Sequence, residues 1–249
     1  MTLQQFFEEH PRVAIAFSGG VDSAYLLYAA KENDADVRAY YVKSPFQPQF
    51  EYEDALQLAR QLDVSMTVLE LDILSDPAIA ANPRNRCYYC KRRIFSAIAE
   101  AAAKDGFPII LDGTNASDDA ADRPGMQALR ELRVLSPLRE CGLTKEKIRQ
   151  LSKDAGLFTH NKPAYACLAT RIPTGTPITQ ELLSRTERSE DFLRNLGFSD
   201  FRIRLMGDAA KIQLPEPQIS QLLLHREAIL AAFKKDYSAV LLDLEVRNG

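Results

Sequence analysis

The sequence predicts an α/β protein in which a doubly wound parallel sheet is followed by a small α+β domain. Up to residue 155, short apolar runs alternate with longer amphipathic stretches, the pattern of consecutive β-α-β units. Beyond it, two alternating segments at 201–206 and 209–214 flank Gly207-Asp208, a hairpin signal. We therefore expect domains at 1–160 and 179–249, joined by a proline-containing interdomain loop at 161–178.

The apolar periodicity assigns each element in turn. In the first domain it predicts strands at 12–17, 37–42, 65–71, 108–112 and 133–138. The helices between and after these strands are expected at 22–32, 51–62, 90–104, 124–132 and 144–155. Thr144 is placed to cap the last of these helices and Gly156 to end it. The second domain reads as helix 179–196, the two hairpin strands, helix 217–233 and strand 238–244.

Composition excludes several classes of protein. With 46% hydrophobic and 26% charged residues among 249, the chain is globular rather than disordered. Its net charge of -3 provides no chain-wide positive field for a nucleic acid. Its apolar runs are shorter than the roughly 20 residues of a membrane span, and its start is unlike a signal peptide. We therefore expect a soluble, cytoplasmic protein with neither nucleic acid nor membrane as partner.

A glycine-rich turn joins the first predicted strand to the first predicted helix. It reads Ser18-Gly19-Gly20-Val21-Asp22-Ser23, and in this position backbone N–H groups and the helix dipole converge on an anion. Gly19 and Gly20 would let the backbone approach phosphates, while Ser18 and Ser23 add hydroxyl donors. Asp22 would repel phosphate without an intervening cation, which indicates a role in binding Mg²⁺. The alternative is a glycine-rich turn that binds no ligand.

A second loop, at 112–119, follows the strand expected at 108–112. Ligands of open parallel sheets lie at the carboxyl ends of strands, so Gly113, Thr114 and the acids beyond them could face a nucleotide. Taken alone, this stretch is equally an ordinary turn.

Three of the four cysteines indicate a metal or sulfur site. Cys87 and Cys90 have Cys-x-x-Cys spacing at a helix entry, and Cys167 lies in the interdomain loop. These thiols, with His160, could bind structural zinc; three thiolates without a fourth also suit an iron–sulfur cluster with one open iron. Cys141 is expected to be a small residue that is buried or half-buried.

A group of cations surrounds the Cys-x-x-Cys pair. They are either solvated surface or a clamp for the carboxylates or phosphate of a small substrate. The group consists of Arg84, Arg86, Lys91, Arg92 and Arg93.

The glycine-rich turn resembles the pyrophosphate-binding loop of the PP-loop superfamily, whose members adenylate a carbonyl or carboxylate oxygen. The whole chain is similar to the LarE family of ATP-dependent sulfur insertases. The strings that carry this resemblance are FSGGVDS at 17–23, NRCYYCKRRIF at 85–95, LDGTNASDD at 111–119, SPL at 136–138, ACLATRIPTGTPIT at 166–179 and FRIRLMGDAAKIQL at 201–214.

The resemblance implies a function and a set of site residues. Family members adenylate a carboxylate of pyridinium-3,5-biscarboxylic acid mononucleotide and replace the activated oxygen with sulfur, for the nickel-pincer cofactor of lactate racemase. One subgroup sacrifices the sulfur of a cysteine matching Cys167; in the other, Cys87 and Cys90 would join it to bind a four-iron, four-sulfur cluster. With all three present, we place this sequence in the cluster subgroup, with Asp22 as a further catalytic residue.

The implied cofactors are ATP, Mg²⁺ and the 4Fe-4S cluster, and the implied assembly is a homo-oligomer, with a hexamer as one form. The implied substrate-binding residues are Arg86, Lys91, Arg171, Glu190, Arg202 and Arg204. Two features depart from the family pattern: the chain ends in DLEVRNG, and Thr174 replaces a common tyrosine.

Three other functions remain open at this stage. An amidating enzyme of the NAD- or GMP-synthetase type would need no thiols. A tRNA thiolase shares the loop and often three cysteines, but the net charge of -3 disfavours it. A module that only senses ATP would need nothing beyond the loop.

Overall fold

The structure is a computed structural model that describes residues 1–118 and 124–247. The chain divides into two compact units, and each is considered by itself. Unit 1 comprises Met1–Ile73 and Arg84–Lys162; unit 2 comprises Leu74–Pro83 and Pro163–Gly249. The short excursion at Leu74–Pro83 means that the chain crosses between the units three times.

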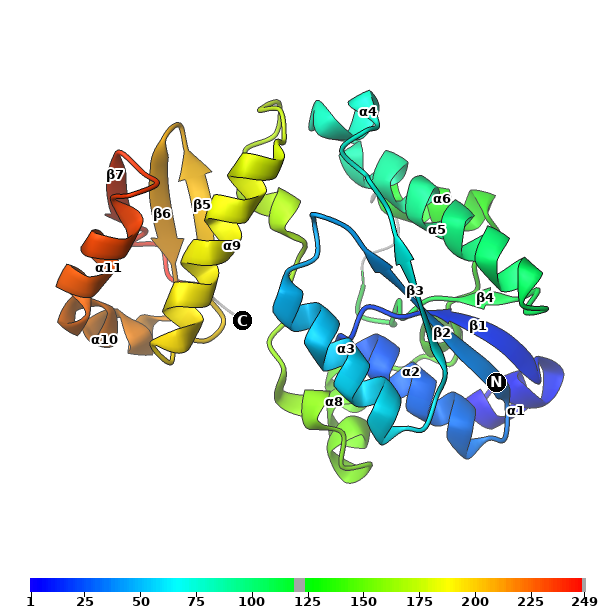
Figure 1. Cartoon of the computed structure of the whole chain (residues 1–249). Helices are drawn as coiled ribbons and strands as arrows, with labels where there is room; N and C mark the ends of the chain where they lie inside the picture. The colour runs from blue at the N-terminus through cyan, green and yellow to red at the C-terminus, as the bar shows by residue number, and fades with distance from the viewer. Residues whose placement is uncertain (119–123, 248–249) are drawn as a thin grey trace. The chain divides into compact units, whose positions relative to one another are not determined.

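Unit 1 is built on a parallel sheet with strand order β3-β2-β1-β4 (Figure 1). The strands are β1 Arg12–Ala16, β2 Asp36–Lys43, β3 Met66–Glu70 and β4 Ile110–Leu111. The helices are α1 Leu3–Glu9, α2 Val21–Glu32, α3 Gln49–Gln61, α5 Arg86–Lys104, α6 Pro124–Glu131, α7 Pro137–Glu140 and α8 Lys145–Asp154. The order reverses between β1 and β4, so the crevice at their carboxyl ends is where such sheets bind ligands.

Alternate residues of the central strands face opposite layers of helices, which confirms the predicted doubly wound α/β class. Val13 and Ile15 of β1 belong to the core cluster that includes residues of α2, α3 and α8. Ala14 faces the other cluster, with Phe95 and Ile98 of α5. Figure 1 shows α5 and α6 on one side of the sheet and α2 and α3 on the other. Both faces are covered, which explains why these strands read as continuous apolar runs.

Several elements differ from the sequence predictions. The strand expected at 133–138 is reduced to a single bridge between Leu111 and Leu135, because Pro137 directly afterwards begins α7. The helix expected at 90–104 begins at Arg86, which places both cysteines of the Cys-x-x-Cys on α5. The helix expected at 217–233 is interrupted at His225. No helix in the described part of the chain is long and apolar enough to cross a membrane.

Unit 2 contains a three-stranded sheet, β5-β6-β7, packed against helices (Figure 1). Its elements are α4 Pro77–Ala80, η2 Leu168–Arg171, α9 Gln180–Asn195, β5 Arg202–Met206, β6 Ala209–Gln213, η3 Glu216–Gln218, α10 Ile219–Leu224, α11 Arg226–Phe233 and β7 Ala239–Leu242, whereas η1 Phe158–Asn161 ends unit 1. The β5–β6 hairpin turns at Gly207, whose φ of 57° glycine adopts readily. Buried Asn82 donates from Nδ2 to the carbonyls of Pro173 (2.9 Å) and Thr176 (3.1 Å), which binds the excursion to the cysteine-bearing loop.

Candidate functional site

The glycine-rich loop connects β1 to α2 at the switch point of the sheet. Within it the Ser18 and Ser23 hydroxyls lie 3.1 Å apart, and Ser23 Oγ donates to the Gly20 carbonyl at 3.2 Å. Gly20 is the N-cap of α2 and its position provides no side-chain cap, so the first N–H groups of the helix are not capped by a side chain. Backbone donors at a helix start are the arrangement that binds phosphate.

Position 19 requires glycine for two reasons, its backbone conformation and its close packing against α3. Its φ is +72°, in the left-handed region. A Cβ there would lie 3.1 Å from the Glu51 carbonyl oxygen and 3.2 Å from Ala55 Cβ, both on α3. The loop is therefore supported from behind by the first turns of α3.

The loop that follows β4 packs directly on the start of α2. A Cβ at Gly113 would lie 2.9 Å from the Ser23 backbone nitrogen, so glycine permits this approach. Buried Asp112 accepts hydrogen bonds from the hydroxyls of Ser136, at 2.6 Å, and of Thr114. The structure thus brings Gly113 to the glycine-rich loop, whereas the Thr114 hydroxyl is bonded to Asp112. Of the acids noted in this loop, Asp119 lies outside the described residues.

Asp22, on the first turn of α2, has one paired and one unpaired carboxylate oxygen. Its Oδ2 lies 2.5 Å from Lys145 Nζ, whereas its buried Oδ1 has no hydrogen-bond partner in the described parts of the chain. Burial raises the pKa of Asp22, with a smaller contribution from the negative charge of Asp118, while Lys145 opposes the rise. A buried, unpaired carboxylate oxygen beside a phosphate-binding loop fits a Mg²⁺ ligand.

Lys145 was not identified from the sequence. Its backbone N–H donates to the hydroxyl oxygen of Ser117, in the loop after β4, at 3.0 Å, which fixes the start of α8 beside that loop. The one available signal was Thr144, whose side chain caps α8 as predicted and so places Lys145 on the first turn.

The cysteines are distributed over both units. Cys87 is exposed and Cys90 half-buried on α5 of unit 1, whereas Cys167 is half-buried at the start of η2 in unit 2. Within 1–118 and 124–247, no three His, Cys, Asp or Glu side chains are grouped as metal ligands. The His160 Nδ1 of the zinc alternative lies 2.9 Å from the Leu157 carbonyl oxygen. Cys141 is half-buried as predicted, and burial raises the pKa of its thiol.

Two of the cations beside the Cys-x-x-Cys pair have distinct surroundings. Arg86 is buried, and its Nη2 lies 4.0 Å from Cys87 Sγ. The methylene groups of Lys91 pack on α6, where a Cβ at Gly125 would lie 2.9 Å from Lys91 Cδ. Both side chains therefore belong to the α5 face of unit 1.

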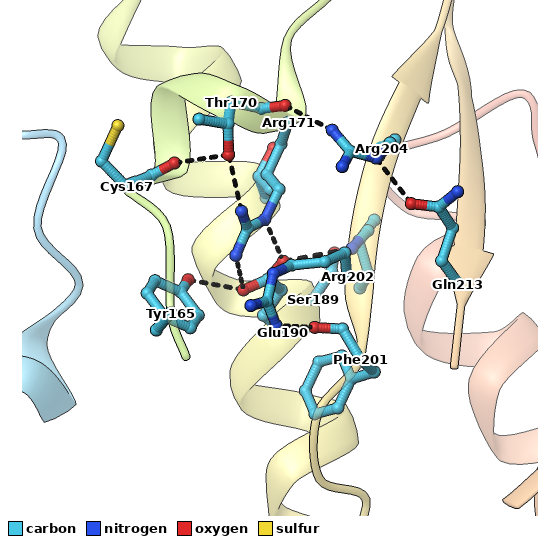
Figure 2. Close-up of polar contacts among 12 residues, drawn as sticks. Tyr165, Cys167, Thr170, Arg171, Ser189, Glu190, Phe201, Arg202, Arg204 and Gln213 are labelled. Carbon is cyan, nitrogen blue, oxygen red and sulfur yellow. Dashed lines mark hydrogen bonds and ion pairs between the residues drawn. The ribbon is translucent and has the colours of Figure 1, made fainter. Parts of the chain in front are cut away.

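In unit 2, four of the expected substrate-binding residues lie close together (Figure 2). Glu190 of α9 is fully buried and forms an ion pair with buried Arg171, with Nε and Oε1 2.7 Å apart. Glu190 also accepts hydrogen bonds from the Tyr165 hydroxyl (2.5 Å) and the Ile203 N–H (3.1 Å). Because these protein donors already satisfy the Glu190 carboxylate, its role is to position Arg171 and Tyr165.

Arg202 and Arg204 add positive charge to this cluster from β5. Arg202 donates to the carbonyls of Phe201, at 2.6 Å, and of Ala164, and Arg204 donates to the Thr170 carbonyl at 2.7 Å. Burial, followed by repulsion from Arg171 and Arg247, lowers the pKa of Arg202 to about 10.

The same causes lower the pKa of Arg204. The three neighbouring guanidiniums are partly balanced by the saturated Glu190 carboxylate and by Asp200, whose Oδ1 lies 3.9 Å from Arg202 Nη1. One positive charge is left in excess, which a bound anion would relieve. Cys167 precedes this cluster, and Figure 2 shows its sulfur pointing away from the arginines.

The parallel sheet with a Ser-Gly-Gly-x-Asp-Ser loop at its switch point defines the class as PP-loop nucleotide-binding proteins. In agreement, residues 12–85 match the family described as queuosine biosynthesis protein QueC.

Comparison with similar sequences narrows the assignment from the PP-loop class to one family. The chain is 33% identical, over 92% of its length and 83% of the relative's, to the pyridinium-3,5-bisthiocarboxylic acid mononucleotide synthase of Lactiplantibacillus plantarum. It is 38% identical to an uncharacterised protein of Synechocystis sp., over 88% of this chain and 82% of the other. A tRNA-specific 2-thiouridylase of Clostridium botulinum is 29% identical over 60% of this chain and 52% of its own length. The chain belongs to the LarE family of pyridinium-3,5-bisthiocarboxylic acid mononucleotide synthases.

Proposed function

We propose that this protein is an ATP-dependent sulfur insertase acting on pyridinium-3,5-biscarboxylic acid mononucleotide in nickel-pincer cofactor biosynthesis. Family membership supports this substrate and reaction. The structural observation that carries the ATP-dependent step is the unpaired Oδ1 of Asp22 beside the open start of α2. An orphaned carboxylate oxygen next to phosphate donors is explained by Mg²⁺ bound with ATP.

The first step is carboxylate activation. A carboxylate oxygen is a poor leaving group, so it attacks the α-phosphorus of ATP and pyrophosphate leaves, which forms an acyl adenylate. Ser18, Gly19, Gly20 and Ser23 would bind the departing pyrophosphate, and Asp22 would bind Mg²⁺. Because position 113 is a glycine, the loop after β4 can pack on the Ser23 backbone and so approach this site.

The second step is sulfur transfer. A sulfur nucleophile attacks the acyl carbon, the bond to the activated oxygen breaks, and AMP leaves. We propose that Cys87, Cys90 and Cys167 bind a 4Fe-4S cluster, which when bound would supply the sulfide that is transferred. The alternative sulfur source is Cys167 itself, sacrificed in a single turnover.

Cys87 and Cys167 each lie close in sequence to a point where the chain passes from one unit to the other. Cys87 lies four residues after Pro83, the last residue of unit 2 before the chain returns to unit 1, and Cys167 lies four residues after Pro163, where the chain enters unit 2. The proposal that these two cysteines act together with Cys90 draws on the family resemblance.

The arginine cluster is the proposed site for the substrate's phosphate. Arg202 and Arg204 would contact it, with Arg171 held in place by Glu190. Arg86 and Lys91, on α5, would contribute to binding a substrate carboxylate. We further propose a cytoplasmic protein, as the composition and the start of the sequence predict, and a homo-oligomer, as the family resemblance implies.

Pyrophosphate release tests the proposed function directly. Purified protein with Mg²⁺ and ATP is expected to release pyrophosphate only when the pyridinium biscarboxylate mononucleotide is added, and mass spectrometry should then detect its thiocarboxylate. An ATP-sensing module would bind ATP and release none, and an amidating enzyme would respond to ammonia instead. Either result would contradict the proposal.

The cluster has its own experiment. Protein reconstituted without oxygen should contain iron and absorb broadly in the visible range, and each of Cys87→Ala, Cys90→Ala and Cys167→Ala should lose iron and sulfur transfer together while adenylation persists. Cys141→Ala is the matched control and should lose neither. Protein that takes up zinc and no iron, or a Cys87→Ala variant with multiple turnovers, would favour the sacrificial route through Cys167.

A further inference from the structure

A lysine at the end of unit 1 lies against the glycine-rich loop. Lys162 Nζ is 3.2 Å from the carbonyl oxygen of Gly19, to which it donates a hydrogen bond. The same ammonium is 2.9 Å from Glu51 Oε1 and 2.7 Å from Asp54 Oδ2, both on α3. The side chains of Lys162 and Glu51 are each 12% exposed, so these contacts are largely protected from water.

The backbone of Lys162 is also fixed. Arg149 of α8 donates to the Lys162 carbonyl at 2.8 Å and to the His160 carbonyl at 2.6 Å. The ring of Phe50 lies beneath the ammonium, with its centroid 5.4 Å from Nζ. A lysine side chain ordinarily retains much rotational freedom. Here that freedom is lost, because both ends of the residue are bound within unit 1.

The contact with Gly19 has a consequence for the neighbouring peptide. In a trans peptide the carbonyl and the following N–H point in opposite directions. A Gly19 carbonyl directed at Lys162 therefore turns the Gly20 N–H away from Lys162, and in this orientation the N–H donates to the Ser18 hydroxyl at 3.4 Å, at the start of α2. Two successive glycines allow other orientations of this peptide at little cost, so the long contact with Ser18 and the Lys162 ammonium together select this one.

We propose that Lys162 is a positioning residue for ATP: through the Gly19 carbonyl it holds the Gly19–Gly20 peptide in the orientation in which the Gly20 N–H can exchange the Ser18 hydroxyl for pyrophosphate as its acceptor. Glu51 and Asp54 fix the ammonium at this place. Lys162 in turn compensates two carboxylates that would otherwise repel an anion nearby. This inference rests on the proposed function of the loop as a pyrophosphate site.

Calorimetric titration with magnesium pyrophosphate tests the inference without requiring the pyridinium substrate. Lys162→Met should weaken pyrophosphate binding about tenfold or more, as loss of a charge-assisted hydrogen bond predicts. Lys31→Met is the matched control, because Lys31 Nζ also donates to a backbone carbonyl, that of Asp63 at 3.2 Å, near the other end of α2. The control should bind pyrophosphate as the wild type does.

A triple variant separates loop orientation from simple charge. Lys162→Met with Glu51→Gln and Asp54→Asn removes the ammonium together with the two carboxylates that it pairs with, and it keeps the measurement possible if the single variant does not fold. It should still bind pyrophosphate several-fold more weakly and show a raised KM for ATP with a smaller change in kcat. If this variant binds pyrophosphate with wild-type affinity, the inference about Lys162 is wrong, whereas the proposed function of the loop is unaffected. A wild-type protein that binds no pyrophosphate would overturn the proposed function as well.

Discussion

The glycine-rich loop of unit 1 and the arginine cluster of unit 2 are two proposed anion sites built on different principles. The loop offers backbone N–H groups at the start of α2 and one acid, Asp22, with an unpaired oxygen. The cluster offers side-chain guanidiniums from η2 and β5, arranged around one buried carboxylate. Backbone donors carry no net charge and need a cation for a polyphosphate, whereas guanidiniums bring their own charge.

This difference determines where each site is vulnerable. The loop depends on close backbone packing, since a single methyl group at Gly19 or Gly113 would meet neighbouring atoms at 3.1 Å or 2.9 Å. The cluster depends on charge balance, since burial and mutual repulsion already lower the pKa of Arg202 and Arg204. Substitutions can therefore distinguish an ATP site from a substrate site.

The largest effect is expected for Asp22→Ala. Loss of the proposed Mg²⁺ ligand should reduce substrate-dependent pyrophosphate release by about 10³-fold or more, since metal stabilisation of the leaving charge is worth several kcal/mol. Asp36→Ala is the control, because that acid forms an exposed ion pair with Arg12. Near wild-type pyrophosphate release by Asp22→Ala would contradict the role of Asp22 as a Mg²⁺ ligand. The loop would then differ from the arginine cluster only in its backbone donors.

Glu190→Gln should act on folding before it acts on binding. Removing one member of the buried Arg171 pair leaves an uncompensated guanidinium and should lower the free energy of unfolding by about 3–5 kcal/mol, measured by urea denaturation. Exposed pairs are worth about 1 kcal/mol or less, so Arg188→Ala, which breaks the exposed pair with Asp236, should change stability little. Unchanged stability with a raised substrate KM would instead make Glu190 a direct substrate ligand.

Arg202→Ala should weaken the binding of the pyridinium substrate and leave the binding of ATP unchanged. Loss of one charged hydrogen-bond donor predicts a rise in KM for the pyridinium mononucleotide of about 10- to 100-fold, with the KM for ATP unchanged. Steady-state rates of pyrophosphate release measure both constants. If the ATP constant rises in parallel, the two anion sites are not independent.

Gly113→Ala should produce the smallest change and affect only ATP. The added methyl group meets the Ser23 backbone at 2.9 Å, and overpacking of this kind costs about 1–3 kcal/mol, or roughly tenfold in pyrophosphate affinity. Gly156→Ala provides the comparison, because the φ of +68° strains an alanine there, whereas its Cβ would meet no described atom beyond the chain neighbours within 4 Å. That variant should lose stability and bind pyrophosphate normally.

The fold class and most elements could be read from local sequence because they follow from hydrophobic periodicity and turn chemistry. The alternating runs predicted the parallel sheet, and Gly207-Asp208 predicted the β5–β6 hairpin. The prediction of a strand at 133–138 was wrong in its extent, since only Leu135 bridges to β4 before Pro137 begins α7. The apolar residues of this segment predicted that it would be buried, but they did not predict how many of its residues would pair with β4.

Local sequence is enough to predict the loop at 18–23, because phosphate-binding backbone needs glycines at consecutive positions between a strand and a helix. Which distant side chains surround this loop depends on tertiary packing. Lys145 and Lys162 reach Asp22 and Gly19 across more than a hundred residues of chain, through hydrogen bonds with sequence separations of 123 and 143. Likewise, Glu190 is saturated because η2, α9 and β5 meet around it. Such contacts depend on the packing of whole elements, and no local pattern encodes them.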